Sequence, residues 1–132
     1  VCASTIAAQF IENGVYKKVL VVAAETLSKY VDWEDRNTCI LFGDGAGAAV
    51  FGEVESGYGL LGMDLGSDGS GGDVLDIPAS GSLHPATLET IANRMHYIHM
   101  DGKAVFKFAV KVMGETVLQS LAKAGLDKTD ID

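Results

Sequence analysis

The sequence is poor in cysteine and in basic residues, and it has no long hydrophobic run. Its two cysteines, Cys2 and Cys39, are too few for a disulfide framework and lack the close spacing of a zinc site. A reducing, cytoplasmic environment is therefore expected. No stretch approaches the roughly 20 apolar residues of a membrane span. The first residues include neither a Met nor a charged segment ahead of an apolar one, so they do not form a signal peptide.

Acidic residues outnumber basic residues by 18 to 10, which gives a formal net charge of -8. Nucleic acids and anionic membranes require concentrated Lys and Arg, so neither is expected as a partner. What the chain does contain is apolar material: 48% of its 132 residues are hydrophobic, enough for the core of one ordinary domain. Disorder is therefore not expected.

The chain begins directly in a helical pattern, with no capping residue ahead of it, which indicates a cut through a longer protein. The Asn-Gly pair at 13–14 predicts the end of this helix. Residues 17–25, KKVLVVAAE, form a continuous apolar run typical of a strand buried on both faces, as in a parallel sheet.

Further along, residues 38–42 and 46–54 read as one strand interrupted by glycine, with 58–66 as its hairpin partner across a turn at 55–57. Surface loops are predicted at 66–73 and 78–85, and a short helix at 86–97. The strongest helix covers 101–125, with Asp101 as its cap and Gly125 as its end. Its apolar stripe consists of Phe106, Val110, Met113, Val117 and Leu121.

The alternating glycines Gly43, Gly45 and Gly47 raise the question of a phosphate site. Residues 45–50, GAGAAV, lack the third glycine of a dinucleotide fingerprint and lead into strand-like sequence rather than a helix. A phosphate needs the N-H groups and dipole of that helix. The favoured interpretation is a glycine-rich strand that passes close to a packed neighbour.

The other reactive side chains give no convincing catalytic or metal site. His84, His96 and His99 are not joined by a cluster of Cys, Asp or Glu, so solvated or loop-packed histidines are expected and no metal. Cys2 on a helix would need a base partner to act as a nucleophile, and a packed thiol is favoured. Cys39, inside an apolar run, is expected in the core.

Two basic features invite a binding role. Arg36 follows several acids, and it could form an ion pair with Asp32 or Asp35, or instead face a phosphate or stack on an adenine ring. Lysines recur every four residues at 103, 107 and 111, which gives either a solvated helix face or a docking patch for an acidic partner.

Residues 35–52, DRNTCILFGDGAGAAVFG, together with 9–29 before them and 99–114, HMDGKAVFKFAVKVMG, resemble β-ketoacyl-acyl carrier protein synthase III, a condensing enzyme of the thiolase superfamily. The resemblance implies an α/β, thiolase-like αβαβα fold, of which the chain would be an internal fragment. Residues 1–78 would end the N-terminal half, and residues 79–132 would be a linker and the start of the C-terminal half.

The same resemblance implies an acyltransferase of type II fatty acid synthesis that works as a cytoplasmic homodimer. Such an enzyme condenses an acyl-CoA starter, typically acetyl-CoA, with malonyl-acyl carrier protein and releases CO2. Acyl-CoA is a substrate, and no cofactor is implied. The family's catalytic Cys, His and Asn match no position of this sequence. The segment by itself is therefore expected to be inactive.

The residues of the family that do match positions of this sequence are those that bind the substrate and the carrier protein. The resemblance assigns Arg36 to the adenine of CoA, with Asn37 as its neighbour in the same CoA-binding loop. It assigns Leu41 and Phe42 to the acyl pocket, with Leu75 as a weaker match, and Lys107 to docking of acyl carrier protein. The expected wall of the pantetheine tunnel is Met100, Gly102, Val105, Phe106 and Ala109.

Two alternatives remain open. One is a related synthase of polyketide or quinolone synthesis, which acyl-donor preference would distinguish. The other is a non-catalytic binding module, which predicts that the segment is a complete natural chain. A segment cut from a longer fold should expose apolar surface, so association or marginal stability is expected.

Overall fold

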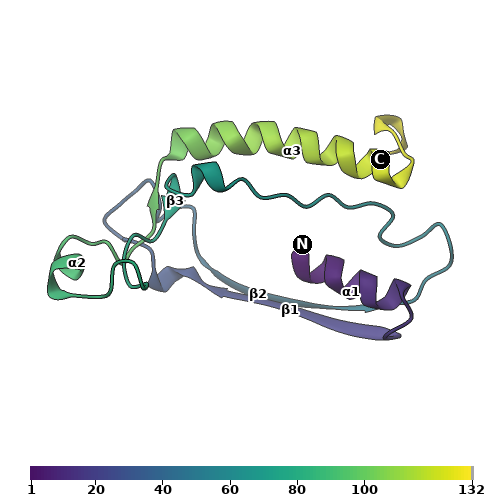
Figure 1. Cartoon of the computed structure of the whole chain (residues 1–132), viewed down its shortest axis with the longest axis horizontal. Helices are drawn as coiled ribbons and strands as arrows, with labels where there is room; N and C mark the ends of the chain where they lie inside the picture. The colour runs from purple at the N-terminus through teal and green to yellow at the C-terminus, as the bar shows by residue number, and fades with distance from the viewer. Residues whose placement is uncertain (132) are drawn as a thin grey trace. The chain divides into compact units, whose positions relative to one another are not determined.

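The computed structural model describes residues 1–131, whose helices and strands are shown in Figure 1. The chain divides into two compact units. Unit 1 comprises residues 1–23 and 46–66 and the described residues from 110 onward, and unit 2 comprises residues 24–45 and 67–109. Neither unit is a continuous stretch of sequence. The domain boundary after residue 78 stays a prediction, and its last residue, Asp132, lies outside the described residues.

The first helix, α1, spans Cys2–Glu12 and ends as the Asn-Gly pair predicts. Gly14 adopts a φ of +69°, and its N-H donates to the carbonyl of Ile11 at 2.9 Å. Glycine reaches this left-handed conformation without the steric cost that other residues incur. Ala7 and Ala8 form the buried face of α1.

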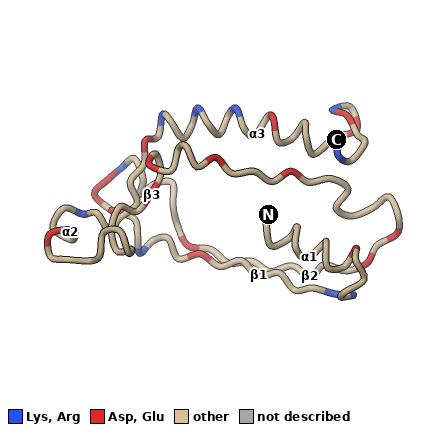
Figure 2. The backbone as a smooth tube through the Cα atoms, viewed as in Figure 1, with Lys and Arg blue, Asp and Glu red and all other residues tan. Residues whose placement is uncertain are grey.

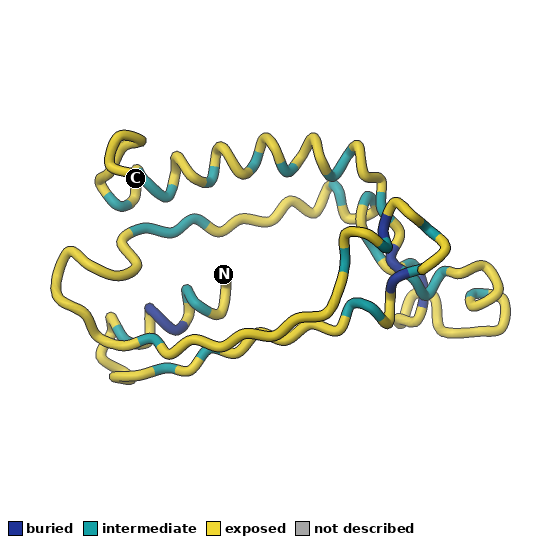
Figure 3. The backbone as a smooth tube through the Cα atoms, turned by 180° about the vertical axis from the view of Figure 1, so that it is seen from behind, coloured by how far each residue is buried: buried dark blue, intermediate teal, exposed yellow. Residues whose placement is uncertain are grey.

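Strands β1 (Lys18–Thr26) and β2 (Asp44–Gly52) form a two-stranded sheet. Ser28, just after β1, hydrogen-bonds Asp44 at the start of β2, while the Lys17 carbonyl lies beside Gly52 at its end. The strands therefore run in opposite directions. Most of their residues are exposed (Figure 3), so the expectation that residues 17–25 are buried on both faces is wrong for the described chain.

The long helix α3 spans Gly102–Ala124 and has the predicted ends. Asp101 Oδ1 accepts the N-H groups of Lys103 and Ala104 at 3.0 and 3.1 Å, and Gly125 follows with a φ of +70°. Most of the expected apolar stripe is exposed, namely Phe106, Val110, Met113 and Val117. Within the described residues, no helix is long and apolar enough to cross a membrane.

Residues 58–66 form no strand, contrary to the expected hairpin. The predicted turn is present, because the Tyr58 N-H donates to the Glu55 carbonyl at 3.2 Å. Beyond it the chain runs beside the end of α3 within unit 1, and Lys123 Nζ donates to Asp64 at 2.6 Å. A Cβ on Gly62 would lie within 3.0 Å of the Ser120 carbonyl oxygen, so this close approach requires glycine.

Unit 2 contains most of the buried core. Strand β3 (Leu75–Asp76) pairs antiparallel with β4 (His99–Met100), and the predicted short helix is present as α2 (Leu88–Ala92). Thr87 and Thr90 form a reciprocal capping box at its start. The predicted loops at 66–73 and 78–85 contain only turns, bends and one 3-10 turn. The buried side chains of this unit are those of Val31, Thr38, Ala79 and Ile98.

Candidate functional site

A cavity in unit 2 brings together most of the side chains that the sequence assigns to a binding surface. Its volume is about 660 Å³. One wall comes from the loop after β1, and the other comes from β4 and the first two turns of α3. Seven predicted site residues line it: Asn37, Leu41, Met100, Gly102, Val105, Phe106 and Ala109. Asp101 and Lys103 also line the cavity, and the sequence reasoning assigned them no binding role.

The other residues predicted for the CoA and acyl site, Arg36, Phe42 and Leu75, do not line the cavity. Each is the neighbour of a lining residue, either in the sequence or across the β3–β4 strand pair. Arg36 is exposed and precedes Asn37, and Phe42 is half-buried and follows Leu41. Leu75 pairs with Met100 across β3 and β4. The structure therefore gathers these positions in one region of unit 2.

Residues 36–41 form a series of turns that shape the loop wall, so the strand expected over 38–42 is wrong. The side chain of Asp35 organises these turns by accepting the Asn37 N-H at 3.0 Å and the Thr38 hydroxyl at 2.9 Å. These hydrogen bonds, the one from the Asn37 backbone first, lower the pKa of Asp35 below its usual value. Thr38 is fully buried, which anchors the loop in unit 2.

Arg36 does not form the ion pair with Asp32 or Asp35 that its surroundings suggested. Among the described residues it has no salt bridge, and Asp35 is used within the loop. The partner of Asp32 is Arg94, which also contacts Glu34 at 3.1 Å. Sequence reasoning missed Arg94, because 62 residues separate it from Asp32 and no local pattern marks it.

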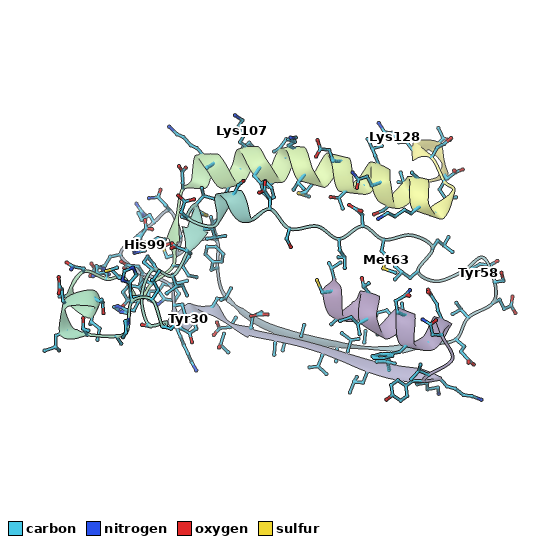
Figure 4. The ribbon with its side chains drawn as sticks, viewed as in Figure 1. Tyr30, Tyr58, Met63, His99, Lys107 and Lys128 are labelled. Carbon is cyan, nitrogen blue, oxygen red and sulfur yellow. The ribbon has the colours of Figure 1, made fainter. Side chains whose placement is uncertain are left out.

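The lysines at 103, 107 and 111 lie along one side of α3, as Figure 2 shows. Lys107 projects outward from the helix (Figure 4) and is exposed. Lys111 is 4.0 Å from Glu115, which is a long ion pair on an exposed surface. This face of the helix is therefore accessible and basic over its first three turns.

Other reactive groups form no further cluster. Cys2 is exposed and Cys39 is half-buried in the turns, so the packed thiol and the core cysteine expected for these positions are not found in the described chain. The rings of His96 and Tyr97 are tilted against each other with centroids 4.0 Å apart, and the buried Nδ1 of His96 has no hydrogen-bond partner among residues 1–131. Within residues 1–131, no group of three His, Cys, Asp or Glu side chains is arranged to hold a metal ion.

The alternating glycines Gly43, Gly45 and Gly47 have no packed neighbour within the described residues. A Cβ on Gly43, Gly45 or Gly47 would meet no heavy atom within 4 Å. The expectation of close packing at these positions is therefore wrong for the described chain. None of the three opens a helix, so they also lack the N-terminal helix geometry of a dinucleotide site.

Known proteins resemble this chain along nearly its whole length. The sequence model of 3-oxoacyl-[acyl-carrier-protein] synthase III matches residues 1–69. Proteins named β-ketoacyl-[acyl-carrier-protein] synthase III from Desulfitobacterium hafniense strain Y51 and Clostridioides difficile strain 630 are 63% and 56% identical over 96% and 97% of this chain. The alignments cover 38% and 39% of those relatives, so the chain spans well under half of their length.

Solved structures of condensing enzymes also resemble this chain over nearly its whole length. The synthase III of Thermus thermophilus superposes with a TM-score of 0.81 at 42% identity, over 98% of this chain and 39% of that one. A priming β-ketosynthase of the R1128 polyketide pathway superposes with a TM-score of 0.77 at 34% identity, over 98% of this chain and 38% of that one. The fold is thus that of part of a thiolase-type condensing enzyme. The chain belongs to the 3-oxoacyl-[acyl-carrier-protein] synthase III family.

Proposed function

We propose that this chain is part of a synthase that condenses an acyl-CoA starter, acetyl-CoA in the first instance, with malonyl-acyl carrier protein to begin type II fatty acid synthesis. The observation that carries the proposal is the unit 2 cavity, which gathers seven of the residues that the family resemblance assigns to the CoA and acyl-binding site. Membership in the family supports the same reaction class.

In this proposal the cavity receives the pantetheine arm of CoA. Met100, Gly102 and Phe106 form its wall, and the small residues Gly102 and Ala109 leave room for a narrow, flexible thiol chain. Arg36 stacks on the adenine, for which its guanidinium is available because it is exposed and forms no ion pair with the described residues. Leu41, Phe42 and Leu75 belong to the apolar side that meets the acyl group.

The chemistry itself is assigned to residues that match no position of this chain. A cysteine thiolate attacks the acyl-CoA thioester and releases CoA. Malonyl-carrier protein then loses CO2, and the resulting carbanion attacks the acyl-cysteine thioester and expels the thiolate. His and Asn side chains stabilise the enolate charge. We infer that the segment alone is inactive, and that the whole protein is a cytoplasmic homodimer that needs no cofactor.

Lys107 is proposed to meet acyl carrier protein. The lysine face of α3 is exposed and basic on a chain whose net charge is -8, so it is a distinctive docking surface for an acidic partner. The approach of the carrier protein to α3 would deliver its pantetheine arm near the same cavity.

The test is the reaction on the intact protein that contains this sequence. With acetyl-CoA and malonyl-carrier protein, it should release CO2 and form 3-oxoacyl-carrier protein, whereas the 132-residue segment should release none. Failure of the intact, folded protein to condense any acyl-CoA would contradict the proposed function. CO2 release by the segment would contradict the inference that its catalytic residues lie elsewhere.

The second candidate is a priming synthase of polyketide synthesis, and the likeness to the R1128 priming ketosynthase is the observation that favours it. The two candidates differ in the acyl donor rather than in the chemistry. A panel of acyl-CoA donors of increasing length separates them, since a fatty acid initiator should turn over acetyl-CoA with the highest kcat/KM.

A further inference from the structure

Arg94 occupies a backbone position that normally belongs to glycine. It directly follows the cap of α2 and has a φ of +58°, in the left-handed region. Its N-H donates to the carbonyl of Ile91 at 2.9 Å, and the Met95 N-H donates to the carbonyl of Thr90 at 3.0 Å. These two hydrogen bonds together define a Schellman motif. Glycine adopts this conformation without strain, so an arginine here needs a reason beyond the turn itself.

The side chain of Arg94 supplies that reason. Its Nε donates to one oxygen of Asp32 at 2.6 Å, and a second guanidinium nitrogen donates to the other oxygen. A third nitrogen lies 3.1 Å from Glu34, and the group sits 5.4 Å from the Tyr97 ring centroid. This fork-shaped, two-point contact with a carboxylate fixes direction as well as distance, which a lysine cannot do.

The contact continues from Asp32 toward the cavity through hydrogen bonds. Asp32 accepts the Glu34 N-H at 2.9 Å through its side chain and the Asp35 N-H at 3.0 Å through its carbonyl. Asp35 in turn accepts the backbone and side-chain N-H groups of Asn37, both at 3.0 Å. Asn37 lines the cavity, and Arg36 lies between the two.

A second contact holds the same loop to the same segment. The Ile98 N-H donates to the Tyr30 carbonyl at 2.8 Å, and Val31 and Ile98 are both buried. The loop at 30–38 is therefore fixed at its base by packing and at its middle by Arg94. Arg94 also offsets the charge of Asp32 and Glu34, two of the three acids that precede Arg36 and would repel a phosphate.

We propose that Arg94 is a positioning residue for the acyl-donor site: its guanidinium, clamped on Asp32 and Glu34, holds residues 32–37 so that Arg36 and Asn37 face an anionic nucleotide thioester. The inference rests on the proposed function, because it assigns the cavity to acyl-CoA. Arg94 itself does not line the cavity, so it acts through the loop.

The sharpest variant is Arg94→Gly, because glycine suits the left-handed backbone and removes only the side chain. In the intact synthase we expect the KM for acetyl-CoA to rise about tenfold, with kcat within about twofold and the melting temperature unchanged. Arg94→Lys keeps the positive charge but cannot make the two-point contact with the Asp32 carboxylate. It should therefore recover only part of the affinity for acetyl-CoA.

Asp32→Asn provides a matched partner variant. If the pair acts as one unit, Asp32→Asn and the double variant with Arg94→Gly should raise the KM to about the same extent as Arg94→Gly alone. If the fold-increases in KM of the two single variants multiply in the double variant, the two residues act independently, and the proposed clamp is overturned. Hydrogen exchange of a peptide covering residues 32–38 should accelerate in Arg94→Gly. Unchanged exchange together with an unchanged KM would also overturn it.

Failure of this inference is distinguishable from failure of the proposed function. An intact wild-type protein that condenses no acyl-CoA contradicts the function, whatever Arg94 does. An active wild type whose Arg94→Gly variant keeps its KM contradicts only the positioning role. A fall in kcat and melting temperature with no change in KM would reveal a purely structural role for Arg94 and would also overturn the inference.

Discussion

Ser28 and Asp44 join the end of β1 to the start of β2: the Ser28 N-H and hydroxyl donate to the two carboxylate oxygens of Asp44, at 2.8 and 2.6 Å. The hydroxyl bond, followed by the backbone bond, lowers the pKa of Asp44 below its usual value of 3.8. A carboxylate with a depressed pKa in the folded state stabilises the fold above its unfolded pKa. That stabilisation is lost as the pH falls through the lower, folded value.

Asp44→Asn should therefore lower the urea midpoint of the intact protein near neutral pH and reduce the loss of stability on acidification. The wild type and the variant should converge once the pH falls below the lowered pKa of Asp44 in the folded state, because the carboxyl group is then protonated in both the folded and the unfolded chain. Asp73→Asn is the control, since the Asp73 side chain is exposed and forms no hydrogen bond with the described residues. A constant difference between wild type and Asp44→Asn at all pH values would contradict the assignment.

Gly62→Ala should destabilise the protein by about 1–3 kcal/mol, because the new methyl group would overlap the Ser120 carbonyl of α3. Gly66→Ala is a matched control four residues away. Its new Cβ meets open space, and alanine restricts the unfolded chain, so its effect should be neutral or slightly stabilising. Equal midpoints for the two variants in urea unfolding would show that α3 does not constrain this segment.

Phe106→Ala should lower kcat/KM for acyl-CoA about tenfold in the intact synthase, because the ring lines the cavity while remaining 71% exposed to an incoming ligand. Phe108→Ala, two residues along α3 and outside the cavity lining, is the control for loss of a phenyl group. Thermal unfolding of both variants separates binding from stability. An equal loss of kcat/KM in both would argue against a specific role for Phe106.

Lys107→Glu should raise the KM for malonyl-carrier protein about tenfold, with little change in the KM for acyl-CoA. The effect should shrink as salt is added, because ions screen contacts between exposed charges. Lys128→Glu makes the same charge change at an exposed site of the other unit, after the end of α3, and should leave the KM near the wild-type value. A similar defect in both variants would point to net charge rather than docking.

Much of the architecture could be predicted from local sequence signals. The ends of α1 and α3 follow from an Asn-Gly pair, an aspartate cap and a closing glycine, since each satisfies helix-end groups by itself. Seven of the residues that line the cavity had been assigned to a binding surface, although Asp101 and Lys103 had not, because family motifs carry positional information that periodicity does not.

What could not be predicted depends on side-chain hydrogen bonds and on long-range contacts. Residues 38–42, TCILF, have the composition of a strand, but Asp35 binds the Asn37 backbone and the Thr38 hydroxyl and stabilises turns instead. The Arg94 clamp joins residues far apart in sequence, and one sequence offers no signal for such a pair. The apolar run of β1 suggested a covered strand, although its covering surface is not among the described residues.

The sheet of β1 and β2 consists of two strands, so within the described residues each strand has one side whose backbone N-H and C=O groups face no further strand. A two-stranded ribbon is marginally stable in water by itself, and open edges are templates for pairing with other chains. The described chain therefore offers both edges, beside the exposed apolar side chains of Leu20, Val22 and Val50, to any neighbouring chain.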